Sequence, residues 1–316
     1  MNPTAEVARP LPGATPVSRS LRPGLRPSEW LERESVFSWL MLTPPLLFLL
    51  AFLAYPFIYG VYLSFFQRQV ASDAHFVGLG NFVNLWDDPI FWKSAVNTVK
   101  FTAVATVLKM VGGLGMALVM NQNFRMKSIT RALLLLPFIV PTVLSTVAWQ
   151  WILDPGMGLI NRLLMVSGIV TTGPSWLGNP TLAMISIILV NTWRGLPFFG
   201  ISILSGLATI PADLHESATI DGAGTWARFR HVTLPLLLPV IFIVTTFSLI
   251  FTFFDFQLVY VLTGGGPANS THLMATYAYA LSRGSGQMGL GSAAALSMVP
   301  VLGLVLVLLA RYVRKD

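Results

Sequence analysis

Six apolar stretches, each long enough to cross a bilayer, constrain this chain more than any other feature. A helix of about 20 residues matches the hydrocarbon thickness, and in lipid every backbone polar group must be satisfied inside such a segment. We therefore expect six transmembrane helices and no soluble core. The predicted spans are about Trp39–Phe66, Ser94–Met120, Thr130–Leu153, Leu182–Gly206, Leu236–Leu262 and Ala293–Val313.

The composition agrees with a protein solvated by lipid. Of the 316 residues, 54% are hydrophobic and only 10% are charged, whereas a soluble domain has about 25% charged residues. The lack of cysteine excludes disulfides and thiolate metal sites. The net charge of +7 comes mainly from basic residues that flank apolar segments. That distribution is a topology signal and argues against a nucleic-acid partner.

The basic residues also predict the orientation. With a cytoplasmic N-terminus, 13 of the 20 lysines and arginines fall on the cytoplasmic side, four fall outside and three lie within spans. The positive-inside rule then places both termini in the cytoplasm. We interpret residues 1–37 as a Pro- and Arg-rich tail, mostly disordered, with a short interfacial helix near Trp30–Phe37. Residues 38–313 form the transmembrane domain, with a polar cytoplasmic loop at 211–235.

This polar loop has the pattern of two short helices. Pro211 stands near the first turn of the first helix, where a missing N–H costs nothing. Gly222 can end that helix in the left-handed conformation, and Thr225 can cap a second helix that stops before Leu234–Pro235. Helices this short cannot bury their own apolar face, so we expect them to dock on a soluble partner. A plain surface loop between two spans is the alternative.

Polar residues inside the fifth span indicate a pathway. Ser248, Thr252 and Asp255 are spaced by four and three residues, which predicts one helical face. Lipid does not tolerate a polar stripe with an acid, so this face should line the bundle interior or a water-filled pathway. Hydrogen bonding between helices is the alternative.

The fourth span offers aromatic and charged residues. Trp193 or Phe198 could stack on a sugar ring, with Gly195 leaving room for it, although aromatic residues are equally ordinary in packing. Arg194 is a charge inside the membrane and needs a partner, a cavity or a snorkelling route. We hypothesise an ion pair between Arg194 and Asp255, to be tested by reversing both charges. The remaining cations of the spans, Lys100 and Lys109, are expected to snorkel or to bind within an assembly.

The chain lacks the motifs of an enzyme. No G-x-x-x-x-G-K-[ST] phosphate loop and no G-x-S-x-G elbow occur in it. Its four histidines are scattered, without the spacing of a metal site. ATP hydrolysis, if it drives this protein, is therefore expected in another chain.

Several motifs resemble those of a known family. The segments Glu216-Ser217-Ala218 and Asp221-Gly222-Ala223, followed by Phe229 and Leu234-Pro235, are similar to the EAA loop of binding-protein-dependent ABC importer permeases. Ser217 stands where the family usually has alanine, and Val232 where it has isoleucine. Further stretches resemble the maltose and glycerol-3-phosphate branch: GLGNFVNLW (78–86), Asn97-Thr98, NTWRGLPFF (191–199) and VLTGGGPANST (261–271).

The resemblance implies an all-α polytopic protein of the cell membrane, with the six transmembrane helices of the type I ABC importer permease fold. The polar loop would be the coupling helix that docks on an ATPase, with Glu216 as an electrostatic contact and Gly222 as a close-approach hinge. The implied docking residues are Glu216, Ser217, Ala218, Asp221, Gly222, Ala223, Phe229, Leu234 and Pro235, and the implied substrate-pathway residues are Trp193, Gly195, Phe198, Ser248, Thr252 and Asp255.

The same resemblance implies an assembly. Expected partners are an ABC ATPase dimer, a second related permease that forms a heterodimer with this chain, an extracytoplasmic solute-binding protein and a sugar-like substrate. No cofactor is expected in this chain, because ATP and Mg²⁺ would be bound by the ATPase. An ion-coupled secondary transporter with Asp255 as the ion carrier is the alternative function, although it would need no docking loop. A membrane scaffold without transport is a further one.

Overall fold

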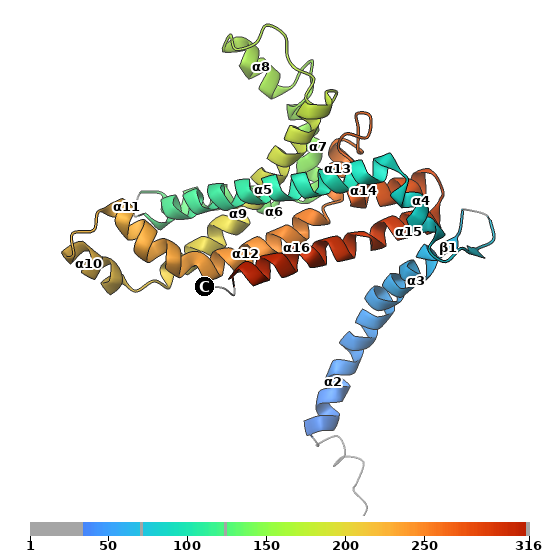
Figure 1. The fold of residues 1–316 in the computed structure, drawn as a ribbon. Coiled ribbons are helices and arrows are strands. Elements are labelled where there is room, and N and C mark those ends of the chain that lie inside the picture. Colours follow the sequence, from blue (N-terminus) through green and yellow to red (C-terminus); the bar gives the residue numbers. More distant parts are fainter. Residues whose placement is uncertain (1–33, 70–71, 123–124, 314–316) are drawn as a thin grey trace, which may run out of the picture. The chain divides into compact units, whose positions relative to one another are not determined.

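The computed structural model describes residues 34–69, 72–122 and 125–313, and Figure 1 shows that they are mostly helical. The N-terminal elements are α2 (Glu34–Leu49), the π-helical turn η1 (Leu50–Ala54), α3 (Tyr55–Ser64), β1 (Phe66–Gln67), β2 (His75–Phe76) and α4 (Gly80–Trp86). The central elements are α5 (Pro89–Asn121), α6 (Lys127–Ile139), α7 (Thr142–Ile152), α8 (Leu159–Val166) and α9 (Pro180–Ala208). The C-terminal elements are α10 (Ala212–Ile220), α11 (Thr225–Arg228), η2 (Phe229–Thr233), α12 (Leu234–Phe253), α13 (Gln257–Leu262), α14 (Met274–Tyr279), η3 (Ala280–Gly284), α15 (Met288–Leu296) and α16 (Met298–Val313).

The chain divides into two compact units, residues 1–57 and residues 58–316. The described part of the first unit is a helix of almost wholly apolar side chains, formed by α2, η1 and the start of α3. The tail predicted for residues 1–37 lies outside the described residues except for its last four, which belong to α2.

The predicted all-helical membrane fold is confirmed. Among the described residues, five helices are long and apolar enough to cross a bilayer, and α6 with α7 forms a sixth span if the bent pair crosses once. This pair is bent by 96°, and Pro141 stands at the break. The bend agrees with the tendency of proline to interrupt a spanning helix where it borders a pathway.

Two π-helical turns show how helices accommodate proline here. The amide of Tyr55 donates to the carbonyl of Leu50, and the amide of Leu234 donates to the carbonyl of Phe229. Each of these i to i−5 bonds stands directly before a proline, Pro56 or Pro235. Because proline removes a donor and its ring crowds the preceding turn, a widened turn lets the helix continue.

The core of the second unit is a bundle of α5, α9 and α12. Helix α5 packs most extensively against α9, and α12 packs against both. A Cβ at Gly113 of α5 would lie 2.2 Å from the Cβ of Phe199 on α9, so the missing side chain allows close approach. Phe101, Phe199 and Leu237 are fully buried in this bundle. Helices α10 and α11 lie at one end of it, and α4 and β1 lie at the other (Figure 1).

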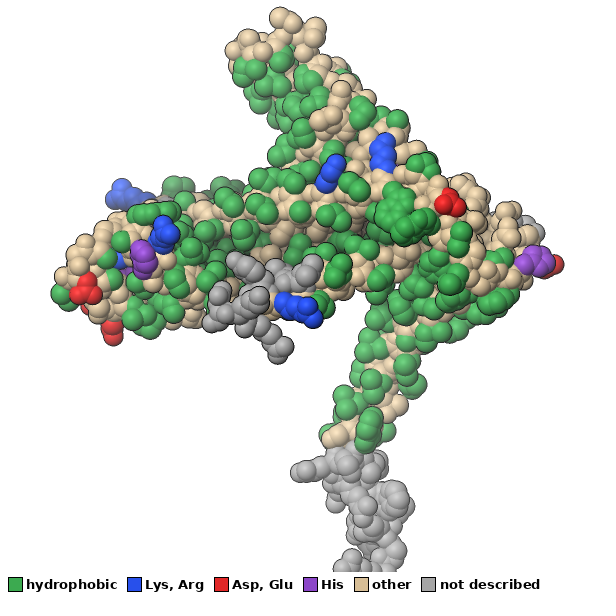
Figure 2. Space-filling model, in the orientation of Figure 1, with side chains coloured by type: hydrophobic (Ala, Val, Ile, Leu, Met, Phe, Trp, Pro, Cys, Tyr) green, Lys and Arg blue, Asp and Glu red, His purple; other side chains and the backbone are tan. Residues whose placement is uncertain are grey.

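The surface of this unit is mainly apolar. Hydrophobic side chains are spread over the face shown in Figure 2, and acidic, basic and histidine side chains lie mainly near the two ends of the bundle, one of which is the α10–α11 end. Exposed apolar side chains along α5 include Val99, Val107 and Val111. A surface of this kind fits a hydrocarbon environment and not water.

Candidate functional site

A cavity of about 580 Å³ lies where α5, α9 and α12 meet the break before α13. It is large enough for a small organic ligand. Its lining mixes charged, amide and hydroxyl groups with aromatic rings. The lining residues are Lys109, Phe138, Thr142, Asn191, Arg194, Gly195, Phe198, Ser248, Phe251, Thr252, Phe254, Asp255, Phe256 and Gln257.

Lys109 of α5 lies at the centre of the hydrogen bonds beside this cavity. Its side chain is only 4% exposed. The Nζ atom donates to Asn191 Oδ1 at 3.0 Å and to Thr252 Oγ1 at 2.6 Å. One ammonium group therefore connects α5, α9 and α12. Of the two alternatives for Lys109, snorkelling and binding within the assembly, the structure agrees with the second, because the ammonium group finds acceptors inside the bundle.

A stripe on α5 could have revealed this role. Thr98, Thr102, Thr106 and Lys109 are spaced by four, four and three residues, and all four side chains are buried. This spacing follows the same rule that drew attention to Ser248, Thr252 and Asp255.

Asp255 lies in the cavity wall, but not on the face of a continuous helix. Helix α12 ends at Phe253 and α13 begins at Gln257, so Asp255 stands in the break between them. Its Oδ1 accepts from the backbone N–H of Leu258 at 3.3 Å, and its Oδ2 accepts from Asn191 Nδ2 at 2.8 Å. The prediction of one helical face therefore holds for Ser248 and Thr252 only. A carboxylate is suited to the break because it accepts a free N–H at the start of α13.

Arg194 has a neutral partner. Its Nη2 donates to Thr142 Oγ1 at 2.6 Å, at the start of α7 just after the 96° bend. The hypothesis of an ion pair with Asp255 is wrong: the two described residues form no direct ion pair, because Asp255 binds Asn191 and Arg194 binds Thr142. Arg194 Nε is buried without a hydrogen-bond partner.

The other residues predicted on the fourth span divide into two groups. Gly195 and Phe198 line the cavity, whereas Trp193 is not among the lining residues and packs edge-on against Trp149 at 5.5 Å between ring centroids. A Cβ at Gly195 would lie 2.3 Å from Cδ of Lys109. The space that Gly195 leaves on this side therefore holds the lysine stem, while Gly195 also lines the cavity.

The polar loop 211–235 forms two helices, as predicted. Helix α10 ends in a Schellman motif, in which Ala223 N–H donates to Ala218 O at 2.9 Å and Gly222 N–H donates to Thr219 O at 3.0 Å. Gly222 has φ +80° between them. Among the described residues no atom lies within 4 Å of a Cβ built on Gly222, so within this chain the glycine is needed for its left-handed backbone.

The second helix of the loop differs from the prediction. The N-cap is Gly224, and Thr225 is the first helical residue and makes no side-chain cap. The helix does not stop before Pro235 but runs through η2 into α12, so that Thr225–Phe253 is one helix of 29 residues. The widened turn before Pro235 explains why proline does not end it.

The loop exposes apolar side chains at the end of the bundle. Ile220 is 87% exposed and Trp226 is 71% exposed, and Trp226 stacks on Phe229. Arg228 Nη1 donates to Thr219 Oγ1 at 2.8 Å and joins α11 to α10. Of the predicted docking residues, Glu216, Ser217, Asp221, Gly222 and Pro235 are exposed, whereas Ala218, Ala223, Phe229 and Leu234 are half-buried.

At the opposite end of the bundle, the Asn97-Thr98 motif holds the loop after α13. Asn97 Nδ2 donates to the carbonyls of Ser270 at 2.9 Å and His272 at 3.2 Å. The backbone N–H of Met274 donates to Thr98 Oγ1 at 2.9 Å. The hydroxyl of Tyr277 donates to Asp88, at the start of α5. The motif therefore has a structural role in binding the segment from Ser270 to Met274.

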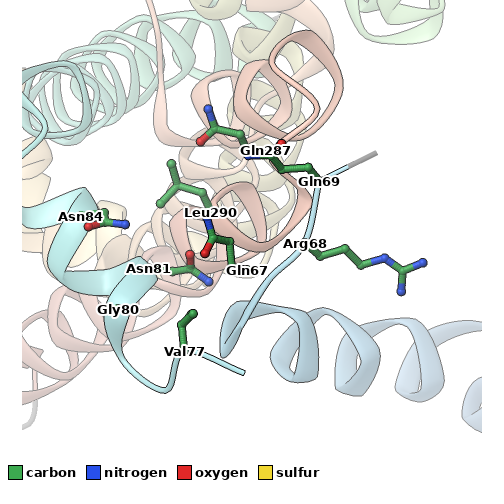
Figure 3. Close-up of a pocket in the computed structure, with 9 residues that line it drawn as sticks. All are labelled: Gln67, Arg68, Gln69, Val77, Gly80, Asn81, Asn84, Gln287 and Leu290. Atoms are coloured by element: carbon green, nitrogen blue, oxygen red, sulfur yellow. The ribbon is translucent and has the colours of Figure 1, made fainter. Parts of the chain in front are cut away.

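A second, smaller cavity of about 150 Å³ lies at this end, and Figure 3 shows its lining. The GLGNFVNLW stretch contributes Asn81, whose Nδ2 donates to the carbonyls of Ser64 at 2.9 Å and Phe66 at 3.0 Å. Arg68 points away from the cavity in Figure 3, and its Nη1 donates to the hydroxyl of Tyr59 at 3.0 Å. Most of the other lining side chains are uncharged amides. This cavity therefore lacks the cluster of charged groups that lines the larger cavity.

A lipid-facing helical bundle with a polar cavity and an exposed helical hairpin at one end defines a membrane transport subunit. The chain belongs to the family of binding-protein-dependent transport system inner membrane components, which residues 109–316 match. It is a permease subunit of an ABC importer and a multi-pass protein of the cell membrane.

Relatives and solved structures agree with this assignment. The trehalose/maltose transport system permease protein MalF of Thermococcus litoralis is 35% identical over 278 residues, which cover 87% of this chain and 91% of the relative. The sulfoquinovosyl glycerol transport system permease protein SmoG of Agrobacterium fabrum is 34% identical, over 91% and 94%. A bacterial ABC transporter involved in the import of the acidic polysaccharide alginate has the same fold, with a TM-score of 0.79, 22% identity and coverage of 91% and 98%.

Proposed function

We propose that this permease carries a sugar or a related polyol or oligosaccharide through the cavity beside Lys109. The named relatives act on trehalose, maltose and sulfoquinovosyl glycerol, which supports a carbohydrate cargo. Ser248 and Thr252 bring hydroxyl groups to the cavity, and Phe198 and Phe251 bring ring faces. This combination suits a molecule with hydroxyl groups on one side and C–H groups on the other.

The observation that carries the proposal is the continuous helix Thr225–Phe253. It begins in the exposed hairpin and ends in the cavity wall, where Thr252 accepts the bond from Lys109. A displacement of the hairpin would therefore move Thr252 and change the cavity. Rigid movement of a helix is a known way to couple distant sites.

The partners follow from the exposed hairpin. Ile220 and Trp226 present exposed apolar surface in the hairpin, and Figure 2 shows acidic and basic side chains at the same α10–α11 end. We infer that an ATPase subunit of a dimer covers this surface and that it binds ATP and Mg²⁺, while this chain holds no cofactor. The hairpin and both termini then lie in the cytoplasm.

At the opposite end, a solute-binding protein would deliver the cargo. A second related permease would form the other half of the pathway, as a heterodimer with this chain. ATP-driven closure of the ATPase dimer would open the cavity outward, and hydrolysis would reset it. The ion-coupled alternative is not favoured, because the family is binding-protein-dependent and the chain carries a docking hairpin that such a transporter would not need.

Co-purification tests this assembly. The tagged chain is extracted from its host in mild detergent, and stoichiometric partners are identified by mass spectrometry. We expect an ATPase and a second permease with the wild type, and loss of the ATPase alone with Trp226→Ala. Trp151→Ala is the matched control, because Trp151 is a tryptophan that is 77% exposed on α7 and not in the hairpin. Wild-type chain without an ATPase, or full retention by Trp226→Ala, would contradict the proposal.

Uptake tests the cargo. Labelled trehalose, maltose and sulfoquinovosyl glycerol are offered to host cells with and without the gene for this chain. Uptake that depends on the chain and stops on ATP depletion supports a carbohydrate importer. Uptake that survives ATP depletion and follows an ion gradient would support the ion-coupled alternative.

A further inference from the structure

The large cavity carries more positive than negative charge. Its described lining includes two cations, Lys109 and Arg194, and one acid, Asp255. Lys109 is 4% exposed, so water does little to solvate its ammonium group. An unbalanced charge at membrane depth is costly unless a counter-charge or a polar ligand accompanies it.

Asp255 does not neutralise either cation by direct contact. Both carboxylate oxygens accept hydrogen bonds from neutral donors, Oδ2 from Asn191 and Oδ1 from the backbone of Leu258. Asn191 stands between the acid and Lys109, since its Oδ1 accepts from the lysine while its Nδ2 donates to the acid. The acid therefore serves to fix Asn191 and the break before α13.

Both cations keep N–H groups that have no acceptor among the described residues. The ammonium of Lys109 has three N–H groups, and two of them are directed to Asn191 and Thr252. Arg194 has five N–H groups, one bond to Thr142 and a buried Nε without a partner. Both residues line the same cavity. Unpaired buried donors on charged groups favour an anionic oxygen as their acceptor.

We propose that this cavity selects a sugar or polyol derivative that bears an anionic group, a carboxylate, sulfonate or phosphate, held between Lys109 and Arg194. The inference rests on the proposed function and narrows its cargo from carbohydrates in general to acidic ones. The guanidinium offers a fork to two anionic oxygens, and the ammonium adds a point charge. The hydroxyl groups of the ligand then face Ser248 and Thr252.

Direct binding to the full chain tests this selectivity without the other subunits. The purified chain is placed in nanodiscs of phosphatidylcholine, which has no net charge, so anionic lipid cannot occupy the cavity. Glucuronate, glucose 6-phosphate and glucose are the probes, because they share the ring and differ at one carbon. Dissociation constants are measured by ligand-observed NMR.

We expect both anions to bind at least about tenfold more tightly than glucose, the size expected for one hydrogen bond to a charged group. Lys109→Gln and Arg194→Gln should each reduce this ratio about tenfold, whereas Lys109→Arg, which keeps the charge, should retain most of it. Lys100→Gln is the matched control, because Lys100 is an exposed lysine on the same helix.

Three results would overturn the inference: glucose binds as tightly as the anions, the anion preference survives both glutamine variants, or none of the probes binds. Such a result would not contradict the proposed function, because co-purification of the ATPase and ATP-dependent uptake test that function in separate experiments. Conversely, anion binding by a chain that brings no ATPase would support this site while contradicting the importer assembly.

Discussion

Lys109 Nζ donates to Thr252 Oγ1 at 2.6 Å, and this bond joins the middle of α5 to the end of α12. Thr252 is 2% exposed, so the bond is shielded from water on both sides. Helix α12 is continuous with the exposed hairpin that begins at Thr225. The contact therefore lies at the meeting point of the cavity and the helix that would move it.

Asn191 should be essential to this arrangement. Replacement by leucine would remove the acceptor for Lys109 and the donor for Asp255 at once. Leaving buried charged groups without these bonds costs about 1.5–3 kcal/mol for each. We expect Asn191→Leu to lower uptake at least about tenfold and to lower the melting temperature in detergent.

Two variants make this test specific. Asn191→Asp keeps an acceptor for Lys109 and should retain more stability than Asn191→Leu. Asn161→Leu is unsuitable as a control, because Asn161 is also buried and bonded. Thr181→Leu, at the exposed start of α9, should leave both readouts unchanged. Wild-type uptake by Asn191→Leu would show that the hydrogen bonds beside the cavity have no part in transport.

Gly195 should not tolerate alanine. The added Cβ would lie 2.3 Å from Cδ of Lys109 and would push the lysine from its acceptors. Overpacking of this kind costs about 1–3 kcal/mol. Gly195→Ala should therefore reduce stability, as measured by thermal unfolding in detergent, and reduce uptake.

Two further variants separate the clash from a general effect of alanine. Gly115→Ala, on α5 with no atom within 4 Å of its new Cβ, should be neutral or slightly stabilising. Combining Gly195→Ala with Lys109→Ala removes the clash and should recover stability relative to Gly195→Ala alone, although not transport. If Gly115→Ala and Gly195→Ala behave alike, the explanation by Lys109 is wrong.

The sequence allowed the membrane fold to be predicted because hydropathy and length are local properties. The runs of apolar residues specify helices without knowledge of what packs against them. The same holds for Gly222, since the left-handed end of α10 depends on the glycine and its neighbours in sequence. The bend between α6 and α7 has a local cause of the same kind, because Pro141 stands at the break and proline disrupts a helix.

The details of the cavity depend on tertiary structure and were predicted less well. Phe254 and Phe256 are not residues that break helices, so they did not predict that α12 ends at Phe253. The side-chain partners of Arg194 and Asp255 come from two helices, α7 and α9, that are distant in sequence from the residues they bind, and no spacing within one segment reveals them. Lys109 could have been found, because Thr102 and Thr106 mark the buried face on which it lies.

His272 predicts a pH dependence of stability. Burial, and to a lesser extent the positive charge of Lys93, lowers the pKa of the His272 imidazole below its usual value. The unfolded chain therefore binds a proton more readily than the folded chain as the pH falls below about 6.5, so stability decreases there and is constant above it. We expect the melting temperature in detergent to fall between about pH 6.5 and pH 5.

Variants assign this effect to the histidine. His272→Gln should flatten the decrease, and Lys93→Met should weaken it by removing the nearby positive charge, although Lys93 also donates to the carbonyl of Ala268 at 3.0 Å. An unchanged pH profile in His272→Gln would assign the acid sensitivity to other groups.

Substitution of Gly222 tests whether the shape of the hairpin matters for transport when its attachment to the bundle is unchanged. With φ +80° and open space around its Cβ position, Gly222→Ala introduces backbone strain without a clash. The left-handed conformation costs an alanine about 1–2 kcal/mol, so the Schellman motif should open and the orientation of α10 should change. The bundle, whose core lies around Phe199 and Leu237, should be unaffected. We expect normal insertion and melting temperature but weaker retention of the ATPase and lower uptake.

Gly224→Ala is the matched control, since Gly224 has φ −67° and also has no atom near its Cβ position. Equal loss in both variants would point to the exposed surface of the hairpin, and no loss in either would contradict a coupling role for the left-handed end of α10.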